Sequence, residues 1–152
     1  MTAQHFLVPI DFSANADYAL EYAMTLASKL QARLTLLHVI EPLVVGSMET
    51  LPYTFIQDLE DKITQTLAPY RERVTAAGLQ CDFAIVHGVP FHVIIETART
   101  DQFNLIIMGT HGRTGLPHVL LGSVAERVVR LAPCPVLVVR VPTDTPAQES
   151  PG

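Results

Sequence analysis

The chain contains little cysteine and no segment that could cross a membrane as a helix. Its two cysteines, Cys81 and Cys134, lie far apart and form no C-x-x-C pair, so neither a disulfide framework nor a zinc site is supported. No apolar run approaches the roughly 18 residues of a membrane span, and the N-terminus lacks a basic or cleavable apolar segment. We therefore expect a cytoplasmic protein with no membrane span, in which both cysteines pack as small hydrophobic side chains.

Charged residues are also scarce. They make up 16% of the 152 residues, whereas about 25% is usual, and hydrophobic residues make up 49%. This balance indicates strands that are buried on both faces, a hidden oligomer interface, or both. The net charge of −5 lacks the basic footprint that binding to a phosphate backbone requires, so we expect no nucleic-acid partner.

Strand-like and helix-like segments alternate along the chain, which is typical of a parallel sheet covered by helices. The length fits one domain with a substantial core. We place this domain at residues 1–141 and a disordered tail, which lacks apolar periodicity, at residues 142–152. The predicted strands lie within residues 6–10, 33–42, 81–88, 105–109 and 136–141, the predicted helices begin near residues 13, 53, 90 and 123, and a long loop occupies residues 41–52.

Single residues mark the ends of these helices and one interruption. Ser13 is a good N-cap, Pro90 suits a first helical turn, and Gly78 stands where a C-terminal glycine belongs. Pro69 lies inside the second predicted helix, where proline removes a backbone hydrogen bond and costs about 3 kcal/mol. We therefore expect a kink or a break at Pro69.

The stretch MGTHGRTGLPHVLLGS follows the apolar run LII and carries four glycines. Gly109 and Gly112 let a backbone approach a ligand closely. At Gly109 and Gly122 we expect positive φ angles, where a methyl group would be strained and would obstruct the ligand. Gly122 and Ser123 begin a helix whose N–H groups and positive dipole end favour an anion, and Arg113 offers a charge. Because ligands collect at the carboxyl ends of parallel strands where the strand order reverses, the stretch predicts a phosphate-binding cradle.

The spacing of the glycines excludes two common phosphate motifs. Neither G-x-G-x-x-G nor G-x-x-x-x-G-K-[ST] occurs, so a dinucleotide fingerprint and a P-loop are unsupported. The chain instead has G-x-x-G, nine residues and then G-S. Together with VPIDFS, LLHVIEP and GSVAERVVRLAPCPVLVVR, this pattern resembles the universal stress protein family, in the subgroup whose G-2x-G-9x-G-(S/T) pattern is associated with ATP binding. The resemblance extends from about Phe6 to Val141.

The resemblance implies a fold, a ligand and a set of contact residues. The fold is an open α/β structure with a parallel five-stranded sheet in the order 3-2-1-4-5 and helices on both faces. It is Rossmann-like and similar to the adenine nucleotide alpha hydrolases. The ligand is ATP, or AMP or ADP in its place, with Mg²⁺ as an accompanying ion. Asp11 would contact the ribose and the backbone of Val39 the adenine. The implied contact residues are Pro9, Asp11, Val39, Met108, Gly109, Thr110, His111, Gly112, Arg113, Gly122, Ser123 and Val124.

Several of these residues also have plain structural interpretations. Asp11 could cap the first helix, because aspartate is a common N-cap, and capping is compatible with ribose contact. The glycines could serve as turn residues only. His111 could contact phosphate or lie in solvent. The other five histidines show no metal-ligand spacing, so we expect them at core or surface positions and predict no metal site built from them.

The sequence favours a nucleotide-binding regulatory protein over an enzyme. Phosphoryl transfer needs a positioned base and a held metal, and near the cradle the sequence offers Ser123 and the more distant Asp11. We expect at most slow hydrolysis and assign no catalytic residue. A related adenylyl-transfer or pyrophosphatase enzyme would want S-G-G-x-D-S or H-x-G-H, which the sequence lacks. A third interpretation is a dimerising interaction module with an empty pocket, which the intact glycine pattern disfavours.

The last predicted strand suggests a homodimer. The segment VLVVRV starts at Val136, ends at Val141 and is apolar at nearly every position. The strand order 3-2-1-4-5 nevertheless puts it at the sheet edge, where unpaired N–H and C=O groups attract another chain. Pro135 and Pro142 limit how far such pairing can extend. Together with the pairing common in the resembled family, this predicts a two-fold homodimer with antiparallel last strands.

Overall fold

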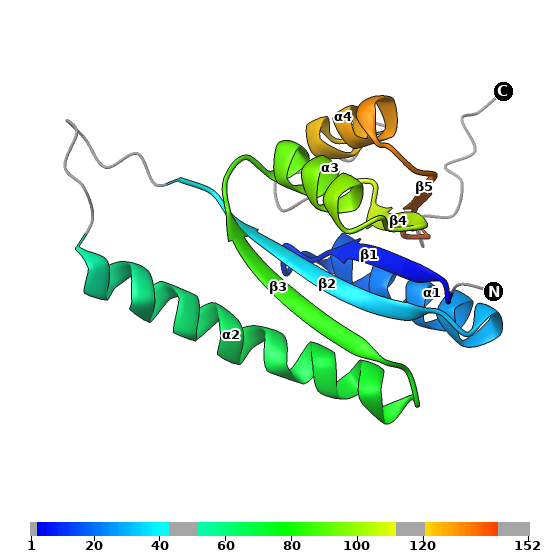
Figure 1. Cartoon of the computed structure of the whole chain (residues 1–152), viewed down its shortest axis with the longest axis horizontal. Helices are drawn as coiled ribbons and strands as arrows, with labels where there is room; N and C mark the ends of the chain where they lie inside the picture. Colours follow the sequence, from blue (N-terminus) through cyan, green and yellow to red (C-terminus); the bar gives the residue numbers. More distant parts are fainter. Residues whose placement is uncertain (1–2, 43–51, 112–120, 143–152) are drawn as a thin grey trace, which may run out of the picture.

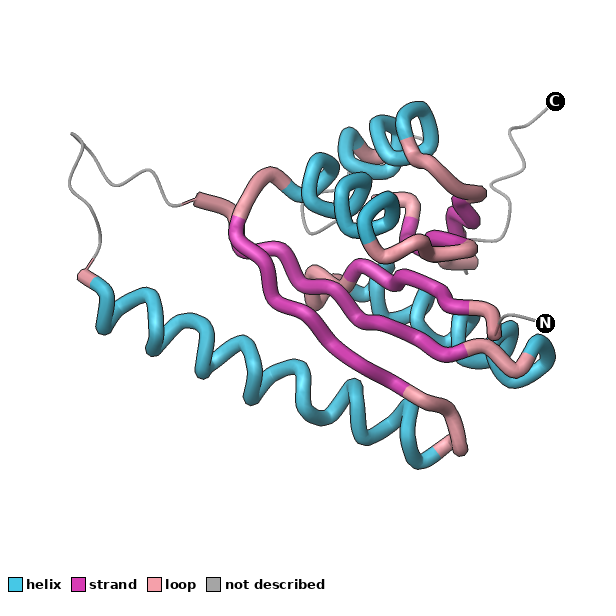
Figure 2. Tube along the Cα trace, in the orientation of Figure 1, coloured by secondary structure: helices cyan, strands magenta, loops and turns pink. Residues whose placement is uncertain are grey.

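The protein forms a parallel five-stranded sheet covered by helices on both faces (Figure 1, Figure 2). The structure is a computed structural model that describes residues 3–42, 52–111 and 121–142. The strand order is β3-β2-β1-β4-β5, which confirms the predicted fold class. The elements are β1 (His5–Pro9), α1 (Ala14–Leu30), β2 (Arg33–Ile40), α2 (Tyr53–Ala76), β3 (Cys81–His87), α3 (Pro90–Thr100), β4 (Leu105–Gly109), α4 (Ser123–Leu131) and β5 (Val136–Val139).

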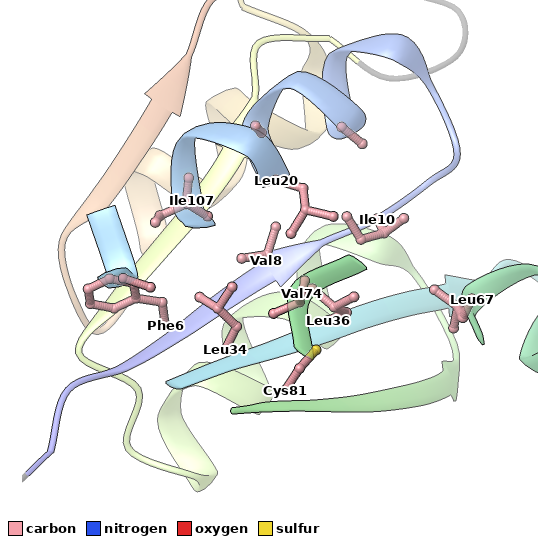
Figure 3. Packing of buried hydrophobic residues seen from close by; sticks show 14 of the residues in the cluster. Phe6, Val8, Ile10, Leu20, Leu34, Leu36, Leu67, Val74, Cys81 and Ile107 are labelled. Carbon is pink, nitrogen blue, oxygen red and sulfur yellow. The ribbon is translucent and has the colours of Figure 1, made fainter. Parts of the chain in front are cut away.

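The central strands are buried on both faces, and their side chains alternate between two cores. Phe6 and Val8 of β1 pack in the core beneath α1 and α2, part of which Figure 3 shows. Leu7, between them, packs in the opposite core beneath α3 and α4. All three side chains are at most 1% exposed, as the two-residue repeat of a strand requires when both faces are covered. This double burial accounts for the low content of charged residues.

Helix α1 lies close to the sheet because small side chains line its buried face. Ala16, Ala19, Ala23 and Ala27 are all at most 5% exposed. The helix begins after Ser13, whose hydroxyl accepts a hydrogen bond from the Ala16 N–H at 3.1 Å, so the predicted N-cap is confirmed. Alanine rows let the backbone of α1 approach the strands beneath it, and this approach has consequences at the end of β4.

Pro69 lies inside α2, on the side of the helix that faces solvent. Helix α2 is continuous from Tyr53 to Ala76, so the predicted break is wrong (Figure 1). Pro69 and Gln65, whose carbonyl loses its helical donor, both lie on the exposed side of the helix. Water can therefore satisfy that carbonyl, while Ile63 and Leu67 remain buried against the sheet.

Three smaller expectations also need correction. Strand β1 lies one residue earlier than predicted, and β5 ends at Val139 rather than Val141. Leu30 and Leu131, which continue the apolar spacing of α1 and α4, are 52% and 53% exposed. Each is the last residue of its helix, beyond the part that the sheet covers.

Part of the predicted organisation falls outside the described residues. This holds for most of the long loop at residues 41–52, of which residues 43–51 are not described, and for all of the predicted tail except Pro142. The limits of the domain and the disorder of the tail therefore stay predictions. Among the helices described, none is both long enough and apolar enough to cross a membrane.

Candidate functional site

A cavity of about 970 Å³ opens where the strand order reverses. From β1 the chain builds the sheet outward through β2 and β3, and then returns to place β4 and β5 on the other side of β1. The cavity is lined by residues at the carboxyl ends of β1, β2 and β4 and at the start of α4. This is where open parallel sheets bind ligands, and the volume lies within the roughly 300–1,000 Å³ typical of ligand pockets.

The structure brings together every predicted contact residue that it describes. Gly112 and Arg113 lie outside the described residues. The predicted residues that line the cavity are Pro9, Asp11, Val39, Met108, Gly109, Thr110, His111, Gly122, Ser123 and Val124.

Asp11 supports the cap of α1 without being the cap itself. One oxygen of its carboxylate, Oδ1, accepts hydrogen bonds from the Ser13 N–H at 3.0 Å and from the Ser13 hydroxyl at 2.5 Å. The same hydroxyl accepts from Ala16 as the N-cap, so the interpretation of Asp11 as N-cap is wrong. The half-buried carboxylate is thus held in one orientation at the wall of the cavity.

Helix α4 points its N-terminus at the cavity. The Gly122 N–H donates to the Thr110 carbonyl at 2.7 Å, which ties the start of α4 to the end of β4. Within the described residues no side chain caps α4, because the cap residue is Gly122. The first turn, from Ser123 to Ala125, lines the cavity. Its N–H groups and the positive end of the helix dipole therefore face the space that an anion would occupy.

The backbone of Val39 faces the cavity because β1 ends before β2 does. Odd-numbered residues of β2 pair with β1: the Arg33 N–H donates to Gln4 and the Leu37 carbonyl accepts from Ile10. Val39 continues this alternation, but the β1 pairing stops at Leu37. Its N–H and C=O therefore point past the end of β1, toward the cavity that Val39 lines.

The sequence matches the universal stress protein family over residues 2–140. The chain belongs to the universal stress protein family. Universal stress protein YxiE of Bacillus subtilis is 34% identical over 143 residues, covering 88% of this chain and 97% of that protein. The solved structure of MJ0577 of Methanocaldococcus jannaschii has a TM-score of 0.77 at 31% identity, covering 94% and 99% of the two chains. A universal stress protein solved in complex with cAMP has a TM-score of 0.70 at 25% identity, covering 91% and 98%.

In this universal stress protein, the two glycines of the motif that the structure describes pack closely against other residues of the same chain. A Cβ atom on Gly109 would lie 2.9 Å from both the Cβ and the carbonyl oxygen of Asn15 in α1. A Cβ atom on Gly122 would lie 3.2 Å from the Thr110 carbonyl oxygen. Neither glycine has the expected positive φ; Gly122 has φ −68°. That expectation is wrong. Close packing against α1 excludes a side chain at Gly109, and at Gly122 the end of β4 leaves little room for one.

Sequence reasoning missed a wall of the cavity that α2 provides. Leu59, Lys62, Ile63 and Thr66 line it at the spacing of one helix face. Lys62 is the one lysine or arginine among the described lining residues, and within the described part its ammonium makes no ion pair. The sequence does place the polar residues Lys62 and Thr66 next to the apolar stripe of this helix. Polar residues in such positions usually lie at the border of the buried face, so they did not indicate a ligand site.

A cluster of rings next to Asp11 was also missed. Phe12 has φ +64°, a left-handed backbone that is rare for an aromatic residue. Its ring stacks on His38, with centroids 4.6 Å apart, and lies 5.9 Å from the Tyr70 ring of α2. Burial and a hydrogen bond to Asp17 raise the pKa of Tyr70 to about 12, so its hydroxyl stays protonated. Contacts from β2 and α2 thus hold the strained turn that carries Asp11.

Proposed function

We propose that this universal stress protein belongs to the ATP-binding subgroup and acts as a nucleotide-dependent regulatory protein. The observation that carries the proposal is the cavity at the reversal of strand order. The N-terminus of α4, which no side chain among the described residues caps, and a fixed carboxylate both face into it. These are the two chemistries that a nucleotide needs, an anion site for phosphate and an acceptor for ribose hydroxyls. A 25% identical relative solved in complex with cAMP supports an adenine nucleotide.

In this proposal each end of the nucleotide has its own contacts. Asp11 accepts hydrogen bonds from the ribose, the backbone of Val39 meets the adenine, and Met108 and Pro9 line the pocket. Gly122 and Ser123 hold the phosphates at the start of α4. The contact residues proposed alongside them are Gly109, Thr110, His111, Gly112, Arg113 and Val124. ATP, or AMP or ADP in its place, is the ligand, and Mg²⁺ accompanies the triphosphate.

In this proposal the protein is a cytoplasmic homodimer that binds the nucleotide to regulate other processes. It hydrolyses ATP slowly at most. The sequence lacks the motifs of adenylyl-transfer and pyrophosphatase enzymes, which disfavours that alternative. A dimerising module with an empty pocket is the other alternative. The size of the cavity and the polar groups that converge on it favour an occupied pocket.

ATP with Mg²⁺ is expected to raise the melting temperature of the protein. A ligand at 100 times its Kd adds about 2.7 kcal/mol to the free energy of unfolding, and each kcal/mol corresponds to roughly 2–4 °C for a chain of this size. Differential scanning fluorimetry should therefore show a rise of several degrees, with Mg²⁺ alone as the control. Mass spectrometry of nucleotide released from the denatured protein should identify the natural ligand. An unchanged melting temperature together with no heat of binding in calorimetry would exclude the proposed function.

Replacing Ser123 by alanine is expected to weaken ATP binding more than adenosine binding. The variant removes a hydroxyl donor at the phosphate end but leaves the helix N–H groups in place. A hydrogen bond to a charged group contributes about 1.5–3 kcal/mol, so the Kd for ATP should rise at least tenfold. Calorimetry with both ligands measures the difference. Equal losses for ATP and adenosine would contradict the placement of phosphate at α4.

A further inference from the structure

The hydrogen-bond ladder between β1 and β2 stops one bond earlier than its register allows. The Ile10 N–H donates to the Leu37 carbonyl at 2.8 Å, and the next bond in a parallel ladder would join the Val39 N–H to the Ile10 carbonyl. That carbonyl instead lies 2.7 Å from Nδ1 of His38. Among the described residues, no backbone hydrogen bond connects Val39 to β1.

The His38 ring is held where it can replace the Val39 N–H as the donor to the Ile10 carbonyl. A carbonyl oxygen only accepts, so Nδ1 of His38 carries the proton that bridges to Ile10. The imidazole stacks on the Phe12 ring at an interplanar angle of 28°. The left-handed backbone of Phe12 turns the chain out of the β1 direction directly after Asp11. Phe12 and His38 both line the cavity, so the residues at the end of the ladder also form part of the wall of the site.

We propose that His38 is a positioning residue that selects adenine: by occupying the Ile10 carbonyl, it leaves the N–H and C=O of Val39 for the base edge of the nucleotide. The inference rests on the proposed function, because it takes an adenine nucleotide as the ligand. It adds a residue that does not touch the ligand through hydrogen bonds of its own but decides which backbone groups do.

The paired donor and acceptor of Val39 match adenine and mismatch guanine. Adenine presents an N6 amino donor beside a ring-nitrogen acceptor, which suit a C=O and an N–H respectively. Guanine has the carbonyl oxygen O6 where adenine has the amino group, and that oxygen would face the Val39 carbonyl. If the Val39 N–H were consumed by Ile10, the site would keep an acceptor alone and would distinguish the two bases less well.

Two substitutions at His38 separate this role from simple packing. Asparagine carries an amide N–H at about the position of Nδ1, whereas leucine has a similar shape and no donor. In His38→Leu the Ile10 carbonyl is left to Val39, so the ratio of the Kd values for GTP and ATP should fall about tenfold. His38→Asn should restore most of the ratio. Inorganic tripolyphosphate, which would contact only the α4 end, should bind both variants and the parent alike.

Amide hydrogen exchange tests the ladder without any nucleotide. The Val39 amide should exchange faster than those of Leu37 and Ile40 in the parent, and become protected in His38→Leu but not in His38→Asn. A protected Val39 amide in the parent, or a base preference that both variants retain, would overturn the role of His38. If the parent binds no nucleotide at all, the proposed function fails, and the exchange result still decides whether His38 ends the ladder.

Discussion

Gly109→Ala is expected to destabilise the protein whether or not a nucleotide is bound. The added methyl group would lie 2.9 Å from the carbonyl oxygen and from Cβ of Asn15, and a helix backbone cannot rotate out of the way as a flexible side chain can. Overpacking of this kind typically costs about 1–3 kcal/mol, which lowers the Tm by several degrees in a chain of this size. Thermal unfolding with and without ATP measures the effect, and the loss should be similar in both.

Gly122→Ala is the matched control for this prediction. Its methyl group would lie 3.2 Å from the Thr110 carbonyl oxygen, so the neighbours need to move by only a few tenths of an ångström, and the backbone of Gly122 suits alanine. The fall in Tm should therefore be smaller than for Gly109→Ala. A Gly109→Ala protein that melts like the parent but no longer binds ATP would show that this glycine serves the ligand rather than the packing of α1.

Val138→Pro is expected to convert the proposed homodimer into a monomer. The Ile106 N–H donates to Pro135, so in the register of β4 and β5 the odd-numbered residues of β5 pair with β4. The N–H of Val138 consequently faces the open edge of the sheet. Proline removes that donor from both copies while leaving the bonds to β4 intact, and edge strands tolerate proline on this side. Light scattering coupled to size exclusion at micromolar concentration should show half the mass of the parent.

Two further variants make the result specific to the strand edge. Val138→Thr keeps the N–H and a β-branched side chain, so it should remain a dimer. Val139→Pro removes a bond to β4 and replaces a buried side chain, so loss of stability should accompany any change in mass. A parent protein that is monomeric, or a Val138→Pro protein that stays dimeric, would reject pairing through β5.

Elements with strong local signals could be predicted almost to the residue. Helix α3 begins at Pro90, where the fixed φ of proline suits a first turn, and α4 begins at Ser123 after a glycine, as expected. The effect of Pro69 and the end of β5 could not be predicted in the same way. The first depends on which side of α2 faces water, and the second on where β4 stops offering partners. Both are properties of the assembled sheet.

The family pattern was enough to predict which residues line the site. It was not enough to predict why a given residue type is needed at a position when the reason is packing against a distant part of the chain. Gly109 was expected near a ligand, but the atom that excludes a side chain there belongs to Asn15, which is 94 positions away in the sequence. The contribution of His38 depends on the alternation of hydrogen bonds along β2 and on where β1 ends. No spacing of residue types encodes that end, where the bond from His38 to the Ile10 carbonyl and the left-handed backbone of Phe12 come together.

The hydroxyl of Ser13 uses both of its hydrogen-bonding functions, donating to Asp11 and accepting from Ala16. This limits which amino acids position 13 can tolerate. Aspartate and asparagine cap helices as well as serine does elsewhere, but a carboxylate here has no proton to donate and would place a second negative charge against Asp11. Threonine retains both functions. The acidic residue two positions before this cap thus excludes aspartate and keeps side chains that can both donate and accept a hydrogen bond.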